Sequence, residues 1–211
     1  PKGKAPKPPT SAPSSKDQVN LTDEESRIMP KSGGGFEQAY NAQAAVDIET
    51  MLIVENHISQ NANDKKEIEP ALRNISELPE EMGKVKDILG DSGYYSRNNV
   101  EKCEEAEITP YLLNKRDKHN SFLKEHLKES LFPPETEDKV ELMKYRMQTS
   151  EGKKIYSKRK STIEPVFGII KSVMGFRQFL LRGVEAVEGE WNLACTAFNI
   201  KRLHRLTVSI L

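Results

Sequence analysis

Tyr156-Ser-Lys-Arg-Lys-Ser-Thr-Ile-Glu-Pro-Val-Phe-Gly-Ile-Ile-Lys171 is the most informative stretch of the sequence. It sets one carboxylate, Glu164, in a row of cations formed by Lys154, Lys158, Arg159, Lys160 and Lys171. Apolar side chains then follow at helical spacing, at Val166, Phe167, Ile170, Val173 and Met174. A carboxylate that holds a divalent metal, beside cations that hold phosphates, suits metal-dependent phosphoryl transfer on DNA. The other interpretation is a surface helix with a basic face.

A second acid stands where a predicted strand ends. Residues Val85–Gly90 predict a short β-strand, and Asp91 follows it directly. Acids at the carboxyl ends of strands project into the crevice where α/β sheets place their sites. Gly93 permits a tight turn after Asp91, and Ser96 is placed to cap a helix over residues 97–105. On its own, an Asp-Ser-Gly sequence predicts an aspartate in an ordinary turn. The stretch downstream, with Glu164 among its cations, favours a catalytic role for Asp91 instead.

The stretch from Tyr156 to Lys171 resembles the third-acid signature of bacterial insertion-sequence transposases that have an Asp-Asp-Glu (DDE) catalytic core. In that signature a Tyr, an Arg, the catalytic Glu and a Lys recur on one helix, matched here by Tyr156, Arg159, Glu164 and Lys171. The family has three residues between Arg and Glu, but this sequence has four, so Lys160 is the alternative occupant of the Arg position. Because proline disfavours helical geometry at the preceding residue, Pro165 predicts that the catalytic helix begins or kinks at Glu164.

Three further blocks resemble the same family, namely residues 21–47, the turn that begins at Asp91, and residues 175–183. The resemblance implies an α/β fold of the ribonuclease-H type, a mixed sheet flanked by helices, with Asp91 as the second catalytic Asp. It also implies two Mg²⁺ ions held by three carboxylates. Lys171 would contact a phosphate and Tyr156 would position groups in the site. The partner implied is the double-stranded DNA of terminal repeats and target, and the residues expected to contact it are Lys158, Arg159, Lys160 and Arg177.

The first catalytic Asp has no clear counterpart in the sequence. In the family it lies on the first strand; here Asp47 is the better substitute as a metal ligand, although it is also predicted to begin a hairpin turn. We therefore expect the C-terminal part of a transposase, with residues 1–19 as a disordered Pro/Lys-rich linker and residues 20–206 as catalytic domain. Residues 114–148 are predicted to be an insertion between the second and third acids. A sheet that lacks its first strand exposes an edge, which predicts association, for example as a homodimer.

Three functional hypotheses remain open at this point. The first is a transposase fragment, catalytically incomplete alone, from an enzyme that cleaves and transfers DNA strands at insertion-sequence ends. The second is a non-catalytic DNA-binding or regulatory remnant that keeps the basic face. The third is a metal-dependent nuclease that hydrolyses DNA without strand transfer, which the sequence does not distinguish from the first.

Composition narrows the class of protein further. The 211 residues include 32 Lys and Arg and 32 Asp and Glu, so the net charge of zero argues against a simple histone-like DNA binder. The sequence contains no apolar run long enough to span a membrane. Cys103 and Cys195 are predicted to be buried, reduced thiols of a cytoplasmic protein. The four histidines are scattered, and none has the spacing of zinc ligands.

The remaining patterns predict a hairpin and two helices. Residues 51–59 are predicted to pair with the preceding strand, and Asn63 with Asp64 to cap a helix that ends near Ile75. A last helix is predicted over 184–206, with one buried face formed by Trp191, Ala194, Cys195 and Phe198 and widened by Leu193, Ile200 and Leu203. Thr22 or Asp23 is predicted to cap a short helical turn.

Overall fold

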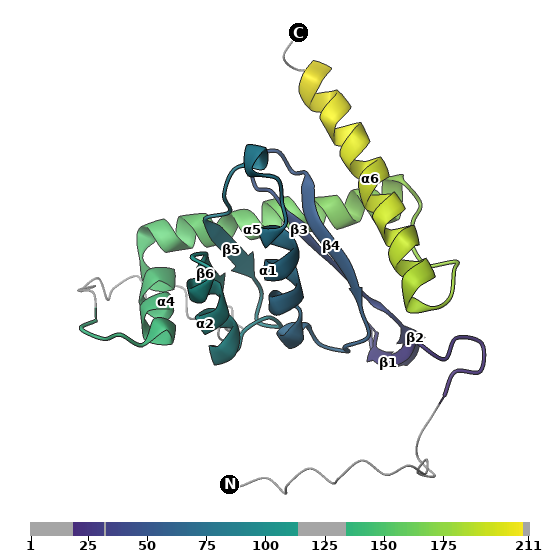
Figure 1. The fold of residues 1–211 in the computed structure, drawn as a ribbon, viewed down its shortest axis with the longest axis horizontal. Coiled ribbons are helices and arrows are strands. Elements are labelled where there is room, and N and C mark those ends of the chain that lie inside the picture. Colours follow the sequence, from purple (N-terminus) through teal and green to yellow (C-terminus); the bar gives the residue numbers. More distant parts are fainter. Residues whose placement is uncertain (1–18, 32, 114–133, 209–211) are drawn as a thin grey trace, which may run out of the picture.

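The computed structural model describes residues 19–31, 33–113 and 134–208, so most of the predicted linker and much of the predicted insertion lie outside it. Strands and helices are mixed along the chain, which confirms the predicted α/β class (Figure 1). The strands are β1 (Arg27–Pro30), β2 (Phe36–Ala39), β3 (Asn41–Val46), β4 (Ile53–Ser59), β5 (Asp87–Gly90) and β6 (Thr109–Leu112). The helices are α1 (Ile68–Ser76), α2 (Arg97–Glu105), α4 (Lys139–Gln148), α5 (Ser150–Gly168) and α6 (Val184–Val208), with short turns η1 (Asp64–Lys66), η2 (Glu80–Met82) and the π-helical η3 (Ile169–Val173). Within these ranges no helix has the length and apolar content needed to cross a membrane.

The strands pair in three two-stranded sheets. β1 with β2 and β3 with β4 are antiparallel, and the second pair is the predicted hairpin, in which Gln43 lies opposite His57. β5 and β6 are parallel and are joined through α2, as in a βαβ unit. Both pairing types of the predicted mixed sheet are therefore present. In the ranges that the structure describes, β3 and β5 each have one hydrogen-bonded neighbour, so each strand keeps an open edge.

Helix α6 is fixed to the hairpin by side chains that bond the strand backbone. The indole Nε1 of Trp191 donates to the carbonyl oxygen of Gln43 at 2.9 Å. The amide of Asn199 pairs with both the N–H and the carbonyl of Ile53, each at 2.8 Å. Because a backbone bond specifies position along a strand, these contacts set the register of α6 on the hairpin. Figure 1 shows α6 running along the side of β4.

The first hydrophobic core surrounds Trp191. The rings of Phe167 and Phe176 stack on the indole at centroid distances of 5.8 and 6.1 Å, and Phe179 meets its edge at 6.5 Å. Such aromatic pairs add to the free energy of simple area burial. The buried members of this core are Ile53, Val166, Ile170, Trp191, Ala194, Cys195 and Phe198, which confirms the predicted buried face of the last helix.

The second core lies between the β5–β6 pair and helices α1, α2 and α4. Its buried members are Ile68, Val100, Cys103, Leu112, Val140 and Met143. Ser96 caps α2 by accepting the N–H of Asn99, as predicted. Cys103 and Cys195 are both buried and free, also as predicted, and burial raises the pKa of each thiol to about 12. Both thiols are therefore protonated at neutral pH.

The predicted widening of the buried face of α6 is wrong. Leu193, Ile200 and Leu203 remain 70%, 62% and 48% exposed. The backbone bonds made by Trp191 and Asn199 turn a narrow stripe of α6 toward the hairpin. Helical periodicity identifies the apolar stripe, but only the packing partner determines how much of it is covered.

Pro165 led us to expect that the catalytic helix would begin or kink at Glu164. Helix α5 does not begin there. It runs from Ser150 through Pro165 to Gly168. Pro165 has no N–H to donate to the carbonyl of Ser161, but both residues are exposed, so water can bind that carbonyl. The helix then widens into the π-helical turn η3, which carries Lys171.

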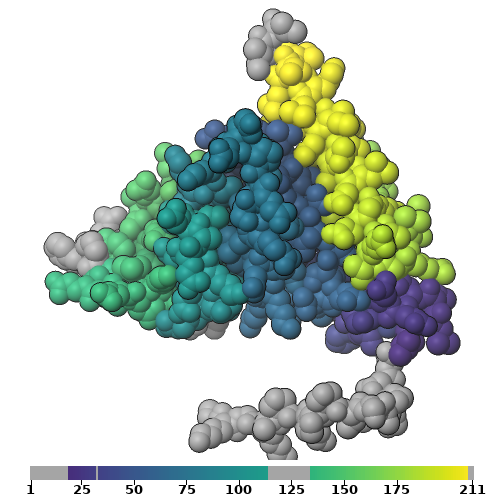
Figure 2. All heavy atoms as spheres, viewed as in Figure 1, coloured from purple at the N-terminus to yellow at the C-terminus, as the bar shows by residue number. Residues whose placement is uncertain are grey.

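Residues 20–26 form turns but no helical turn, so that prediction is wrong, and Asp23 and Glu25 also cap the start of α6. In these turns Asp23 accepts the Tyr40 hydroxyl at 2.7 Å. Val184 N–H donates to Glu25 Oε2 at 2.8 Å and Gly183 N–H to Asp23 Oδ1 at 3.3 Å. Burial would raise the pKa of Asp23, but these hydrogen bonds, led by that of Tyr40, lower it. Figure 2 shows the β1–β2 region beside the first turns of α6.

The contribution of the Trp191 core to the stability of the fold can be tested with two valines, one in α5 and one in η3. Val166 is fully buried, whereas Val173 is 68% exposed. We expect Val166→Ala to lower the free energy of unfolding by about 2 kcal/mol, since two methyl groups and their packing are lost. The matched Val173→Ala should change it by less than about 0.5 kcal/mol. Urea denaturation of both variants measures the difference, and equal losses would contradict this description of the core.

Candidate active site around Asp91

Asp91 follows the last residue of β5, at the carboxyl end of the strand. Its Oδ1 accepts the backbone N–H of Gly93 at 2.7 Å, and its carbonyl accepts that of Tyr94 at 3.3 Å. A Cβ at position 93 would lie 2.9 Å from Asp91 Oδ1, so glycine permits the turn to close on the acid. The carboxylate is thus held at the strand end by the backbone of its own turn.

A second carboxylate, that of Asp64, also lies close to Gly93. Its Oδ2 would be 2.9 Å from the same Cβ, which places both acids beside one glycine. Its Oδ1 accepts the side-chain amides of Asn41 and Gln43, both at 2.8 Å. Tyr94 extends this network by donating its hydroxyl to Gln43 Oε1. Burial, followed by the charge of Asp64, raises the pKa of Tyr94, which keeps the phenol protonated as a donor.

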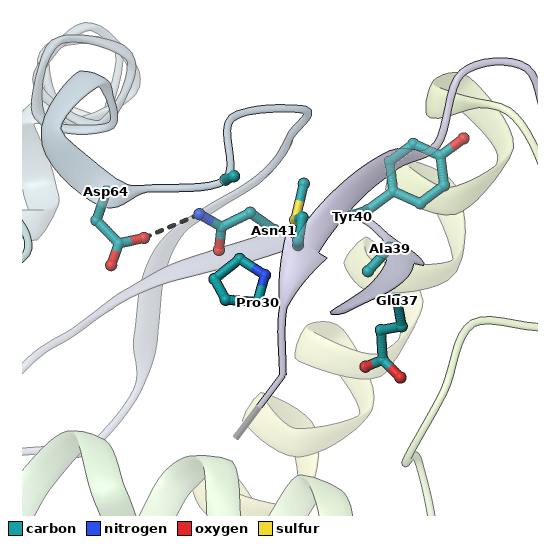
Figure 3. A pocket seen from close by; sticks show the side chains of 8 residues that line it. Pro30, Glu37, Ala39, Tyr40, Asn41 and Asp64 are labelled. Carbon is teal, nitrogen blue, oxygen red and sulfur yellow. Dashed lines mark hydrogen bonds between the residues drawn. The ribbon is translucent and has the colours of Figure 1, made fainter. Parts of the chain in front are cut away.

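Asp64 and Asn41 also line a hollow of about 290 Å³. Figure 3 shows the amide of Asn41 turned toward Asp64, with Pro30, Glu37 and Ala39 from β1 and β2 across the hollow. The hollow is polar and carries two carboxylates, so it favours cations or hydrogen-bond donors. None of the site residues predicted from the sequence lines it.

The side of the hairpin that faces α1 is polar and buried. His57 Nδ1 lies 2.7 Å from Glu55 Oε1, and its Nε2 lies 3.0 Å from Glu67 Oε2. Ser59 donates to Glu67 Oε1 at 2.8 Å, and Asn74 of α1 donates to Glu55 at 2.9 Å. Burial alone would lower the pKa of His57, but the hydrogen bonds and charges of the two glutamates outweigh it and raise the pKa. His57 therefore bridges two buried carboxylates, which favour its protonated form.

The third-acid stretch begins at Tyr156 within α5 and ends at Lys171 in η3. Helix α5 contacts both β3 and β5. Glu164 is exposed, as are Lys158 and Lys160. Arg159 is half-buried, with its guanidinium carbon 5.9 Å from the centroid of the Tyr156 ring. Its Nε is buried without a hydrogen-bond partner among the described residues. Of the two candidates for the family's arginine position, Arg159 packs on the tyrosine and Lys160 faces solvent.

The other predicted site residues lie further along the chain. Lys171 is exposed, with Nζ 5.6 Å from the centroid of the Phe167 ring, and Arg177 Nε donates to the Lys171 carbonyl at 3.3 Å. Asp47 accepts the N–H and hydroxyl of Thr50 at 2.8 and 2.6 Å and so closes the hairpin turn, as predicted. It stands at the opposite end of β3 from Asn41, about 20 Å along the strand at the usual rise per residue.

The fit to a divalent metal can be judged from these placements. In the part of the chain that the structure describes, no three His, Cys, Asp or Glu side chains gather closely enough to hold a metal ion. The structure brings Asp91 together with Asp64, and it does not bring Glu164 and Asp47 into one set with them. The described residues thus offer a pair of carboxylates and not the complete three-acid set.

An α/β fold with an acid at a strand end and a cation-rich helix across the strands is the arrangement of many enzymes that act on phosphate esters. A family model described as "Transposase DDE domain" matches residues 7–200, which is most of the chain. This chain therefore belongs to the DDE transposase family, whose substrate is DNA and whose members use divalent metal ions. Comparison with curated proteins and with solved structures gives no match.

Sequence reasoning did not identify Asp64 as a neighbour of Asp91. It interpreted Asn63 and Asp64 as a helix cap, and Asn63 does cap η1 by accepting the Lys65 N–H. The side chain of Asp64 instead accepts two amides from β3. The available signal was the pair Asn41 and Gln43, which are polar residues two apart on one face of a predicted strand.

The closeness of Asp64 and Asp91 predicts a specific coupling. Gly93→Ala should lower the free energy of unfolding by about 1–3 kcal/mol, because the new methyl group meets both carboxylates. Combining it with Asp64→Ala should recover part of that loss, which a double-mutant cycle measures as an interaction energy. Gly168→Ala is the control, since nothing lies within 4 Å of a Cβ there. Strict additivity would contradict the placement of Asp64.

The buried His57 bridge predicts a pH dependence of stability. The pKa of His57 is raised in the folded protein. Its contribution to the free energy of unfolding is therefore complete below the pKa of the unfolded state, about 6.5, and is lost as pH rises through the pKa of the folded state. We expect His57→Gln to remove this decline from the free energy of unfolding measured by urea denaturation between pH 5 and 9. His204→Gln, at an exposed position of α6, should retain it. If both variants keep the decline, another group is responsible.

Proposed function

We propose that this chain is part of a transposase catalytic unit that cleaves and joins DNA at the ends of an insertion sequence. The observation that supports this most directly is Asp91, held at the carboxyl end of β5 in a chain that belongs to the DDE transposase family. Asp91 would be the second acid of the unit and Glu164 the third. Mg²⁺ is the metal expected, because it prefers carboxylate oxygens, water and substrate phosphate.

The cations of α5 would hold the DNA backbone during this reaction. Lys158 and Lys160 are exposed and free to contact phosphates. Arg159 packs on Tyr156, which would hold its guanidinium in place for a phosphate oxygen. Lys171, exposed on η3, would contact a phosphate close to Glu164. When bound, a divalent metal would polarise the scissile phosphate and activate the attacking oxygen.

The first acid would come from a strand outside the described residues. β3 and β5 each have an open edge, and α5 contacts both, so a strand that paired with them would rest on α5. An acid on such a strand would join Asp91 at the same end of the sheet. Asp47 is less suited to this role because its carboxylate is bonded to Thr50 at the far end of β3. On this proposal the described residues alone are catalytically incomplete.

A non-catalytic DNA-binding remnant is the second candidate. It is favoured by the finding that no three metal-ligand side chains gather within the described ranges, while the cations of α5 are exposed. Such a protein would bind DNA through charge alone. Metal and Glu164 would then be irrelevant to its binding.

Metal and DNA binding measured together distinguish these candidates. We expect the chain to bind Mn²⁺ weakly in isothermal titration calorimetry, and to lose about tenfold or more in affinity with Asp91→Asn or Glu164→Gln. Glu81→Gln, at an exposed position of η2, should leave Mn²⁺ binding unchanged. DNA affinity in a fluorescence anisotropy titration should rise when Mn²⁺ is present.

Three results would count against the proposal. Absence of Mn²⁺ binding, with DNA binding that Glu164→Gln leaves unchanged, would support the remnant instead. Metal-dependent nicking of supercoiled DNA by the chain alone, lost in Asp47→Ala, would show that Asp47 is the first acid and that the chain is complete. Absence of any DNA binding would contradict both candidates.

A further inference from the structure

One buried amide joins the turn that carries Asp91 to the turn that carries Asp64. Asn99 lies in the first turn of α2 and is 2% exposed. Its Nδ2 donates to the carbonyl oxygen of Lys65 at 2.8 Å and to that of Tyr94 at 2.6 Å. Lys65 follows Asp64 directly, and the backbone N–H of Tyr94 donates to the carbonyl of Asp91. Each bond of the amide therefore ends close to one of the two acids.

The need to satisfy buried backbone groups does not by itself explain this arrangement. A side-chain amide carries two hydrogens, and both can serve carbonyls of one turn. Asn99 instead divides them between two turns that are far apart in the sequence. Its own helix is held firmly, since Ser96 caps α2 and Val100 and Cys103 are buried in the second core. The amide thus connects both turns to one rigid element.

We propose that Asn99 is a positioning residue for the metal site of Asp91. This inference rests on the proposed function, because it takes Asp91 as a metal ligand, and it adds a residue that acts without contacting the metal. By joining the turns, Asn99 keeps the carboxylate of Asp64 beside that of Asp91, each 2.9 Å from a Cβ at position 93. The negative charge of Asp64 strengthens the binding of a divalent cation at Asp91, and this effect falls as the distance grows. Without Asn99 the two turns would separate and the affinity for metal would fall.

A second amide, that of Gln43 on β3, joins the same turns through side chains. Its Nε2 donates to Asp64 Oδ1 at 2.8 Å, and its Oε1 accepts the Tyr94 hydroxyl. Replacing Gln43 would change the hydrogen bonds of the Asp64 carboxylate directly. Asn99 bonds only backbone carbonyls in this region, so its replacement changes the spacing of the turns and leaves the bonds of both carboxylates in place. Asn99 is therefore the residue that tests positioning alone.

The affinity of the full chain for Mn²⁺, measured by isothermal titration calorimetry, tests this role. Asn99→Ala removes both bonds and should weaken Mn²⁺ binding by roughly tenfold or more. Asn99→Ser is a milder variant, because a hydroxyl has one hydrogen and cannot bond both carbonyls, and it should weaken binding by at least about threefold. Circular dichroism verifies that each variant is folded, and the serine variant decides if the alanine variant is not.

The matched control for lost stability is Val187→Ala. Val187 is fully buried in α6, an element that carries neither acid. Its truncation should lower the free energy of unfolding, as that of Asn99 does, while Mn²⁺ affinity stays within about twofold of that of the unchanged chain. Urea denaturation of the same samples gives the stability of each variant.

A double-mutant cycle with Asp64→Asn separates positioning from a general loosening of the site. Asparagine keeps the Oδ1 that accepts the amides of Asn41 and Gln43, but it removes the charge. Asp64→Asn should weaken Mn²⁺ binding by roughly tenfold in the unchanged chain, since a nearby negative charge is lost. In the Asn99→Ala background it should weaken binding by less than about threefold, because that charge has already moved away.

Three results would overturn the positioning role while the proposed function stands. In the first, the unchanged chain binds Mn²⁺ and the Asn99 variants bind it equally well. In the second, Val187→Ala weakens binding as much as the Asn99 variants do, so that affinity simply follows stability. In the third, Asp64→Asn has the same effect with and without Asn99. If the unchanged chain does not bind Mn²⁺, the proposed function fails and the positioning role fails with it.

Discussion

The bonds that α6 makes to the backbone of the β3–β4 hairpin are the constraint on which the rest of the structure depends. Trp191 bonds the carbonyl of Gln43, and Asn199 bonds both backbone groups of Ile53. These bonds satisfy polar groups that would otherwise be buried without partners, so they allow an apolar core to form around the indole. Phe167 stacks on that indole and joins the end of α5 to α6. The placement of the third-acid helix thus follows from contacts made by α6.

One face of the hairpin is therefore apolar, and the other is free to be polar. Ala42, Ala44 and Ile58 pack toward the Trp191 core. On the opposite face Gln43, Glu55 and His57 are buried, and each has hydrogen-bond partners. A buried network of this kind is costly if any member lacks a partner. It is also what holds the amide of Gln43 against Asp64, so the acid beside Asp91 depends on the same polar layer.

The sequence was sufficient to predict elements whose signal is local. The hairpin closed by Asp47, the strand before Asp91 and the Ser96 cap of α2 are examples, because each depends on residues within a few positions of one another. Predictions were wrong where the structure depends on contacts between residues that are far apart in the sequence. The exposure of Leu193 and Ile200 depends on how α6 is rotated on the hairpin. Asp64 looked like a helix cap, since nothing near it in the sequence indicates the amides of β3.

The distribution of charge suggests that, in the proposed reaction, one surface binds the DNA and another carries out the chemistry. Asp64 and Asp91 both lie beside Gly93 and together repel a phosphate. The exposed cations of α5, Lys158 and Lys160, attract it, at positions away from that glycine. DNA can therefore be held by the helices while its scissile phosphate is kept from the acids until a cation neutralises them. In such an arrangement the acids contribute little to DNA affinity without metal, and metal binding controls whether the phosphate reaches the reactive position. Separate surfaces for holding and for chemistry are also consistent with zero net charge, because the two kinds of site need opposite signs.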